Sequence, residues 1–160
     1  MIYDSPVGAL EIEAGNRGIV MIDWVNNPKG RKLRARLEPL IVRTGCDRLI
    51  ETAIAQLDEY FHARRYELNF PIQPVGTAFQ MQVWEALKDI QYGTTKTYSE
   101  VALSIGRSTS CRAVANAIGR NPLNIIVPCH RVVAAKGVGG YAGGHDAKMF
   151  LLKMERPTGR

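Results

Sequence analysis

The sequence has 160 residues, of which 46% are hydrophobic and 22% charged, a composition typical of a globular protein that buries a core. No apolar run approaches the ~20 residues that span a bilayer, and the N-terminus lacks the basic head and apolar block of a signal peptide, so we expect a cytoplasmic protein. The net charge of +6 lies in the second half, because residues 1–76 carry ten basic and ten acidic residues whereas residues 77–160 carry eleven and five. A basic half indicates either a polyanionic partner or simply a basic surface.

The three cysteines form no C-x-x-C pair. Cys46, Cys111 and Cys129 are too few and too widely spaced for a disulfide framework or a zinc site. We therefore expect three free thiols in a reducing compartment, with no metal and no cofactor.

The first half is predicted to be a small α+β unit. Leu10, Ile12 and Ala14 alternate with glutamates, which is typical of a half-buried strand. A Gly-Asn-Arg-Gly turn over residues 15–18 and an apolar stretch over residues 19–25 then predict a hairpin.

Two further segments complete this half. The basic stretch 31–36 follows a Pro-Lys-Gly turn and favours a solvated loop or a short helix, although it could touch phosphates. Ile50, Ile54, Leu57 and Phe61 recur at helical spacing, so residues 47–62 are predicted to form an amphipathic helix.

Residues 69–76 contain two prolines and a glycine and mark the predicted domain boundary. We expect an N-terminal α+β domain over residues 1–76 and a mostly helical C-terminal domain over residues 77–160. Thr77 and Gln80 form a capping box at the start of the first helix of the second domain.

Two short helices follow. Thr97 and Glu100 form a second capping box, which opens a helix that ends at Gly106. Ser108 or Thr109 is expected to cap the next helix, which runs to about residue 118 with Gly119 at the C′ position. Two helices joined in this way have the dimensions of a helix-turn-helix.

The second helix of this pair carries small residues on its outer face. Its buried side comes from Val114, Ala117 and Ile118, which leaves Arg112, Ala113, Ala115 and Asn116 outside. A major-groove reader would display long polar side chains here, whereas alanines permit the close approach that a minor groove requires. Arg112 is then the one long side chain able to enter a duplex. Five basic residues and one acid lie between Lys96 and Arg131, which also favours DNA binding.

The apolar run 125–127 leads into Pro128, Cys129, His130 and Arg131. A buried cysteine is normally an inert small hydrophobe. The flanking histidine and arginine argue for a reactive one, because cationic neighbours stabilise a thiolate and a nearby base generates it. Cys129 is therefore the predicted nucleophile.

His130 follows Cys129 directly, and adjacent side chains usually point apart, so we expect a bridging water between them. His130 also needs a carboxylate on its other ring nitrogen. Glu155, which closes a helix predicted over residues 148–154, is the available candidate. The glycine-rich loop 137–144 lacks the ending of a P-loop and is expected to line a pocket with its amides.

Residues 77–156 resemble the catalytic domain of the O6-alkylguanine-DNA alkyltransferases, also called methylated-DNA–protein-cysteine methyltransferases. The signature is Pro-Cys-His-Arg-Val at 128–132. The other matching motifs are Gly-Thr-Ala-Phe-Gln (76–80), Thr-Tyr (97–98), Arg-Ala-Val (112–114), Asn-Pro (121–122), Gly-Gly-Tyr (139–141) and Leu-Leu-x-x-Glu (151–155). The first half resembles the family only loosely, in its Ser-Pro-x-Gly start and its strand-then-helix order.

The resemblance implies DNA repair by direct reversal of damage. An alkyl group would pass from O6 of a flipped guanine to Cys129, irreversibly and once per molecule. His130 would take the thiol proton through water, and Glu155 would polarise the histidine. Tyr98 would donate a hydrogen bond to the departing guanine, and Asn121 would tie together the turn beneath the site.

The implied partner is double-stranded DNA containing O6-alkylguanine, bound through the minor groove. Arg112 would fill the gap left by the flipped nucleotide, with Ala113 and Asn116 beside it on the same helix. The main chain of Val132 and the Tyr141–Ala142 amides would read the guanine. Neither a membrane nor an obligate protein partner is implied.

Three features depart from the family's pattern. Ala142 stands where several relatives carry a hydroxyl, so a contact to O6 there must come from a backbone N–H. The glycine-rich loop is one residue shorter than in many members, and the N-terminal zinc ligands of some relatives are absent.

Two alternative functions stay open. The first is a non-catalytic relative that binds alkylated DNA, although members of that branch replace the acceptor cysteine. The second is a cysteine hydrolase that uses Cys129 and His130, but such a function explains neither the small residues on the outer helix face nor the basic second half.

Overall fold

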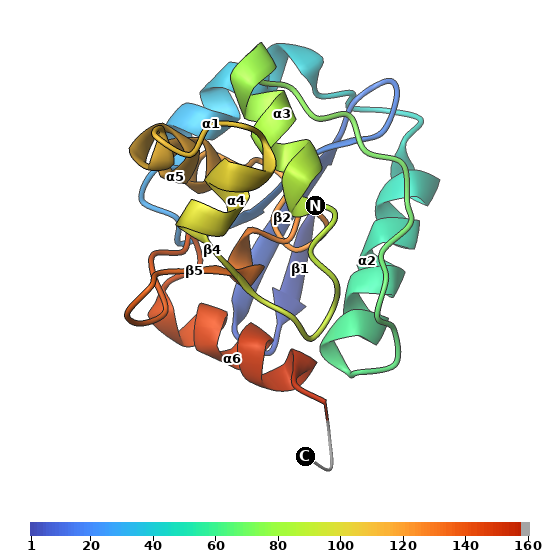
Figure 1. Ribbon diagram of the computed structural model, residues 1–160. Coiled ribbons are helices and arrows are strands. Elements are labelled where there is room, and N and C mark those ends of the chain that lie inside the picture. The colour runs from blue at the N-terminus through green and yellow to red at the C-terminus, as the bar shows by residue number, and fades with distance from the viewer. Residues whose placement is uncertain (158–160) are drawn as a thin grey trace.

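Three antiparallel strands in the order β1-β2-β3 form the N-terminal sheet of the computed structural model, which describes residues 1–157 (Figure 1). The strands are β1 (Ile2–Ser5), β2 (Gly8–Ala14) and β3 (Ile19–Trp24). The predicted hairpin of β2 and β3 is confirmed, with Ile12 opposite Ile22. Strand β1 is not predicted by the sequence, because four residues are too short for a periodic pattern to stand out.

Helices cover this sheet. The basic segment forms α1 (Gly30–Leu37), which continues into the short 3₁₀ helix η1 (Glu38–Leu40). On α1, Arg34 makes ion pairs with Glu11 and Glu13 of β2, so part of the basic stretch is neutralised within the fold. The predicted amphipathic helix is α2 (Asp47–Phe61), which lies along one side of the sheet (Figure 1).

The second half is mostly helical, as predicted. It contains α3 (Ala78–Leu87), α4 (Tyr98–Ser104), α5 (Cys111–Gly119), the 3₁₀ helix η2 (Cys129–Arg131) and α6 (His145–Glu155). Two short strands, β4 (Lys96–Thr97) and β5 (Val132–Val133), pair in parallel. This pairing joins segments far apart in the chain and is not predicted by the sequence. The α+β fold class is confirmed.

The capping motifs predicted for α3 and α4 are formed fully at α3 and in part at α4. Both hydrogen bonds of the Thr77–Gln80 capping box are present at α3. At α4 the Thr97 hydroxyl accepts from the Glu100 N–H, so this half of the second box is formed. Gly106, with φ of +72°, ends α4 in a Schellman motif, in which Arg107 N–H bonds to Ala102 O and Gly106 N–H to Leu103 O.

The predicted ends of α5 are wrong. The helix begins at Cys111 with Ser110 as its N-cap, and its start has no side-chain cap from Ser108 or Thr109. Gly119 is the last helical residue, and the cap position falls on Arg120. Helix α6 also begins earlier than predicted, at His145, directly after Gly144 at φ of +90°. The shifts at α5 arise because end signals fix a helix boundary only to within one or two residues, whereas α6 begins three residues before its predicted start.

The two halves of the chain join along the outer edge of β3. Ile22 N–H bonds to Pro122 O at 2.8 Å, and Asn124 N–H bonds to Ile22 O at 3.0 Å, so the segment before Cys129 runs beside the strand. Buried side chains from both halves form one continuous cluster. The predicted boundary at residue 76 lies in the loop between α2 and α3. Residues 158–160 of the predicted second domain lie outside the described residues. The division of the chain into two domains stays a prediction. Within residues 1–157 no helix has the length and apolar character to cross a bilayer.

Candidate active site

The segment that carries Cys129 is held in a strained turn. Ile125 adopts φ of +76°, a left-handed conformation that is unusual for a β-branched residue and costs energy unless its surroundings impose it. Asn121 provides this restraint, because its Nδ2 donates to Val127 O at 2.9 Å while its Oδ1 accepts from Leu123 N–H at 2.9 Å. The buried Asn121 amide therefore closes the turn beneath the cysteine, the position that the family resemblance implies for it.

The Cys129 thiol is buried, with 6% of the residue exposed. Burial raises the pKa of this thiol to about 11, although the Asn121 amide and the Lys148 ammonium act in the opposite direction. The expectation that flanking His130 and Arg131 stabilise a resting thiolate is therefore wrong. Desolvation outweighs them, and Arg131 is engaged elsewhere.

His130 and Glu155 form the pair expected from the sequence. His130 Nε2 lies 3.0 Å from Oε1 and 3.2 Å from Oε2 of Glu155, and both residues are almost completely buried. Burial lowers the pKa of His130 despite the carboxylate beside it, so its imidazole rests neutral. The second nitrogen, Nδ1, is buried and has no hydrogen-bond partner within residues 1–157. Nε2 is thus committed to Glu155, and Nδ1 is free to exchange a proton.

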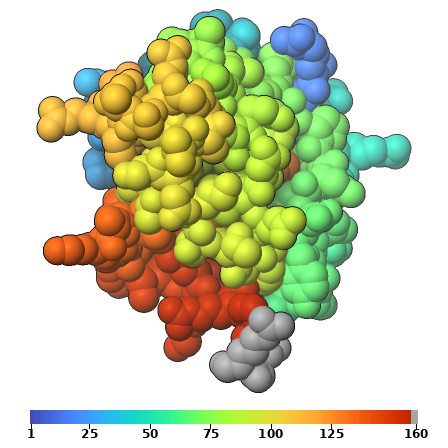
Figure 2. All heavy atoms as spheres, viewed as in Figure 1, coloured from blue at the N-terminus to red at the C-terminus, as the bar shows by residue number. Residues whose placement is uncertain are grey.

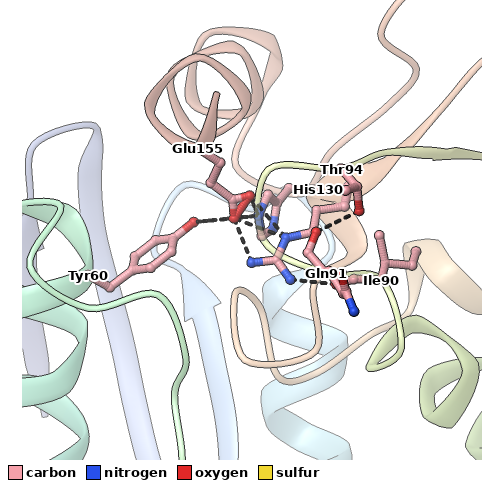
Figure 3. Close-up of polar contacts among 7 residues, drawn as sticks. Tyr60, Ile90, Gln91, Thr94, His130 and Glu155 are labelled. Carbon is pink, nitrogen blue, oxygen red and sulfur yellow. Dashed lines mark hydrogen bonds and ion pairs between the residues drawn. The ribbon is translucent and has the colours of Figure 1, made fainter. Parts of the chain in front are cut away.

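Two further side chains hold the Glu155 carboxylate. Arg131 Nη2 lies 2.6 Å and its Nε 3.0 Å from Oε1, and Arg131 Nη1 donates to Ile90 O at 2.7 Å. Tyr60, from α2, donates its hydroxyl to Oε1 at 3.1 Å; Figure 3 shows Tyr60 and His130 approaching the same carboxylate. Burial alone would raise the pKa of Glu155, but the hydrogen bonds and charges of His130 and Arg131 lower it to about 2. Glu155 is therefore ionised.

Lys148 on α6 is a buried cation close to the thiol. Its Nζ donates to Val132 O at 2.6 Å and to Gly140 O at 3.1 Å. Desolvation lowers the pKa of Lys148 to about 8, and the charge of Cys129 opposes this shift. The Val132 carbonyl, part of the main chain that the resemblance assigns to the guanine, thus already accepts a hydrogen bond.

Tyr98, the first residue of α4, is half-buried beside the glycine-rich loop. A Cβ at Gly139, whose φ is +81°, would lie 2.9 Å from the Tyr98 hydroxyl, so only glycine permits this approach. Burial and then the charge of Cys129 raise the pKa of Tyr98, which keeps its hydroxyl a proton donor. The same loop places Tyr141 with its ring 6.3 Å from that of His130, and Ala142 half-buried beside it.

Helix α5 presents the residues predicted to meet DNA. Arg112, Ala113 and Asn116 are exposed, whereas Val114, Ala117 and Ile118 are buried. Helix α5 packs on α4, whose first residue is Tyr98. On the face shown in Figure 2, the surface of α4 (yellow) lies between that of α5 (orange) and that of the C-terminal segment (red). The exposed helix pair and the site thus meet through α4.

Three residues of the site are not identified by the sequence reasoning. Lys148 carries a signal, because helical spacing from Leu151 and Glu155 places it on the buried face of α6. Tyr60 carries none, since its contact with Glu155 crosses from one half of the chain to the other. Asn124 carries none, because its amide is oriented toward nearby Cys129 by Ile22 in the other half of the chain. No group of three or more His, Cys, Asp or Glu side chains in the described part of the chain could hold a metal ion.

Comparisons with known proteins give a consistent result. The DNA-binding domain of 6-O-methylguanine DNA methyltransferase matches residues 78–157, and the ribonuclease-like domain of the same family matches residues 1–74. The methylated-DNA–protein-cysteine methyltransferase of Methanosarcina acetivorans is 41% identical over 155 residues, which cover 96% of each chain. The Mycobacterium tuberculosis O6-methylguanine methyltransferase superposes with a TM-score of 0.81 at 34% identity, over 99% of this chain and 94% of that one. A structure of the same enzyme in complex with DNA also gives 0.81 at 34% identity, over 98% and 94%. The chain therefore belongs to the 6-O-methylguanine DNA methyltransferase family.

Proposed function

We propose that this protein repairs alkylated DNA by moving the alkyl group from guanine O6 to its own Cys129, irreversibly and once per molecule. One observation carries the assignment to Cys129. The residue that follows it, His130, is fixed through Nε2 by an ionised Glu155 and keeps a buried, unpartnered Nδ1. Of the three cysteines, Cys129 is the one that is followed by a histidine, which can act as a general base.

The acid–base steps follow from the resting protonation states. The thiol starts protonated and His130 neutral, so the proton of Cys129 passes to Nδ1, through a water, when the sulfur attacks. A sulfur–carbon bond forms, the carbon–oxygen bond breaks, and its electron pair stays with the guanine. The guanine takes up one proton, which balances the proton that the thiol gives up. Glu155 stabilises the imidazolium that forms, and Tyr98 donates a hydrogen bond to the departing base.

The alkylated atom is out of reach inside a stacked duplex, so the nucleotide must leave the stack. We assign Arg112 to fill the gap it leaves, because this side chain is long, cationic and exposed on α5. The exposed Ala113 and Asn116 allow α5 to approach a minor groove closely. The structure of the Mycobacterium tuberculosis relative with DNA supports DNA binding by this fold.

The guanine-reading groups belong to the same proposal. The main chain of Val132 and the backbone amides of Tyr141 and Ala142 would contact the flipped base. Asn121 would maintain the turn on which the sulfur sits.

The test is incubation with a duplex carrying O6-methylguanine, followed by peptide mass spectrometry. We expect one methyl group on the peptide that contains Cys129 and none on those that contain Cys46 or Cys111. The variants Cys46→Ala and Cys111→Ala should retain transfer, and Cys129→Ala should lose it. Methylation of another cysteine, or transfer by Cys129→Ala, would contradict the assignment.

A further inference from the structure

Asn124 is a buried amide that connects the N-terminal sheet to Cys129. It is 1% exposed and lies where the segment before the cysteine pairs with β3. Its Nδ2 donates to Ile22 O at 2.9 Å and to the Asp23 carboxylate at 3.3 Å. Its Oδ1 lies 3.7 Å from the Cys129 sulfur.

The hydrogen-bond partners fix which way this amide faces. A backbone carbonyl and a carboxylate can only accept, so the nitrogen of the amide must be on the side of β3. The oxygen then faces the sulfur, and an amide oxygen has no proton to give. The contact therefore exists only if the Cys129 thiol donates its S–H.

Asp23 supports this orientation. Its carboxylate is 4% exposed and also accepts from Asn27 Nδ2, at 3.0 Å to each oxygen. Neither Asp23 nor Asn124 has a part in the proton transfer proposed above. A buried carboxylate held by two amides has an energetic cost, and orienting Asn124 gives it a role.

We propose that Asn124, oriented by Asp23 and the Ile22 carbonyl, is a positioning residue that holds the Cys129 thiol by accepting its S–H. The proposal deepens the function assigned above and rests on Cys129 being the alkyl acceptor. As a consequence, the resting sulfur keeps its proton and is not yet a nucleophile. To attack, the S–H must leave the Asn124 oxygen and give its proton to His130 Nδ1 through water.

Several charged or titratable groups face the sulfur besides this amide. Lys148 from α6 favours the thiolate, whereas Asp23 from β3 disfavours it. Tyr98 from α4 and Tyr141 from the glycine-rich loop also interact with the charge of Cys129, and His130 is its neighbour in the chain. Replacing Asp23 by asparagine removes one opposing charge, while the Ile22 carbonyl still accepts from the Asn124 nitrogen. The loss of this charge lowers the pKa of Cys129.

The first experiment records the infrared S–H stretch in a Cys46→Ala/Cys111→Ala background, in which Cys129 is the one remaining thiol. We expect Asn124→Leu, which is similar in size but cannot accept, to move the band to higher wavenumber. The matched control is Gln73→Leu, because Gln73 is another buried amide whose oxygen bonds to Arg17 N–H at the distant turn of the hairpin. It should leave the band in place. A band that does not move in folded Asn124→Leu would overturn the proposal.

The second experiment uses Asp23→Asn in the same background and does not depend on whether Asn124→Leu folds. The rate of alkylation by iodoacetamide, followed by intact mass across pH, reports the thiolate fraction. We expect the midpoint to fall by about half to one pH unit, so that the rate at pH 8 rises about three- to tenfold. An unchanged midpoint would remove Asp23 from the proposal, and a raised midpoint would contradict it.

These measurements distinguish a failure of the proposed function from a failure of the positioning role of Asn124. The S–H band and the thiol titration need no DNA and no alkylated base. If the mass label from O6-methylguanine falls on another cysteine, the proposed function fails whatever the band does. If the label falls on Cys129 but neither Asn124→Leu nor Asp23→Asn changes the thiol, only the positioning role fails.

Discussion

The carboxylate of Glu155 lies 3.0 Å from Nε2 of His130, and His130 is withdrawn completely from solvent. This contact selects the tautomer of the imidazole, because a carboxylate can only accept and Nε2 must carry the proton. Nδ1 is then the basic nitrogen. The pair thus fixes which atom of His130 can receive the proton of Cys129.

Replacing Glu155 by glutamine should slow alkyl transfer on the order of 10- to 100-fold, because the imidazolium that forms loses its counter-charge. Binding of unmodified DNA should not change. The measurement is single-turnover transfer from an O6-methylguanine duplex, at a temperature where circular dichroism shows the variant folded. Tyr60→Phe is the matched control, since it removes one hydrogen bond to the carboxylate but keeps the charge, and it should have a smaller effect. Equal rates for Glu155→Gln and the unsubstituted protein would remove Glu155 from the mechanism.

Arg112→Ala should weaken repair of a lesion in duplex DNA far more than reaction with the free alkylguanine base, because the side chain acts on base flipping and not on the sulfur. The rates on the two substrates measure this directly. Arg120→Ala removes the same charge from the other end of α5, where the residue is also exposed, and should reduce both rates little. Equal losses on both substrates in Arg112→Ala would assign that residue another role.

DNA affinity should fall steeply with salt and depend little on sequence. Neutralised phosphates release counterions, and minor-groove contacts distinguish bases poorly. Fluorescence anisotropy with two undamaged duplexes of different sequence, titrated at several salt concentrations, gives both quantities. Binding that does not change with salt would contradict the role given to the basic second half. A strong preference for one duplex would contradict the role given to the small residues on the outer face of α5.

The free energy of unfolding should decrease as the pH falls from neutral. Glu155 has a pKa of about 2 in the folded protein against an ordinary value of 4.5, so the folded state binds fewer protons than the unfolded chain. Its contribution, about 3 kcal/mol, is present above pH 4.5 and is lost as the pH falls toward 2. The lowered pKa of His130 has the same sign, and its contribution is lost below 6.5. Denaturant unfolding at a series of pH values tests this, with Glu155→Gln as the comparison. A free energy that stays constant from pH 7 to pH 3 would contradict it.

Transfer should stop at one alkyl group per protein and leave a less stable molecule. The product is a thioether, which has no good leaving group, so progress curves should plateau at equal amounts under excess substrate. The alkyl group also enters a site already filled by Val127 and Val132, both buried. Overpacking of this kind costs about 1–3 kcal/mol and lowers Tm by about 2–4 °C per kcal/mol in a chain of this size. Product in excess of protein would overturn the mechanism, whereas an unchanged Tm would overturn only the packing argument.

The sequence predicts best where the cause of a structure is local. The Thr77–Gln80 box depends on residues three apart, and the amphipathic pattern of α2 on residues three and four apart, and both are found in the structure. The ends of α5 are predicted wrongly, because several serines and threonines compete as caps over the few residues before it. The β4–β5 pairing has no local cause, and nothing in either segment alone indicates it.

The same distinction applies to the site. Cys129 and His130 are neighbours and could be named from the residues themselves. Asn121 could be named only through the family resemblance, and Glu155 only as a plausible carboxylate that spacing alone does not select. The direction of the Cys129 pKa could not, because it depends on how deeply the fold buries the sulfur and on Lys148 and Asp23, from α6 and β3. Arg131 illustrates the error: its position beside the cysteine suggests a thiolate partner, yet its guanidinium binds Glu155.

The pairing of Ile22 with the segment that precedes Cys129 affects how the chain is synthesised. The N-terminal sheet leaves the ribosome first. Residues 71–73 then pair with the Ile19 end of β3, but the edge at Ile22 has no partner there until residues 122–124 follow. An open strand edge can pair with another chain, so a nascent or truncated protein carries an aggregation risk that the finished one does not. The residues that close this edge directly precede Cys129. The chain therefore loses this open edge when the segment that carries the sulfur docks on β3.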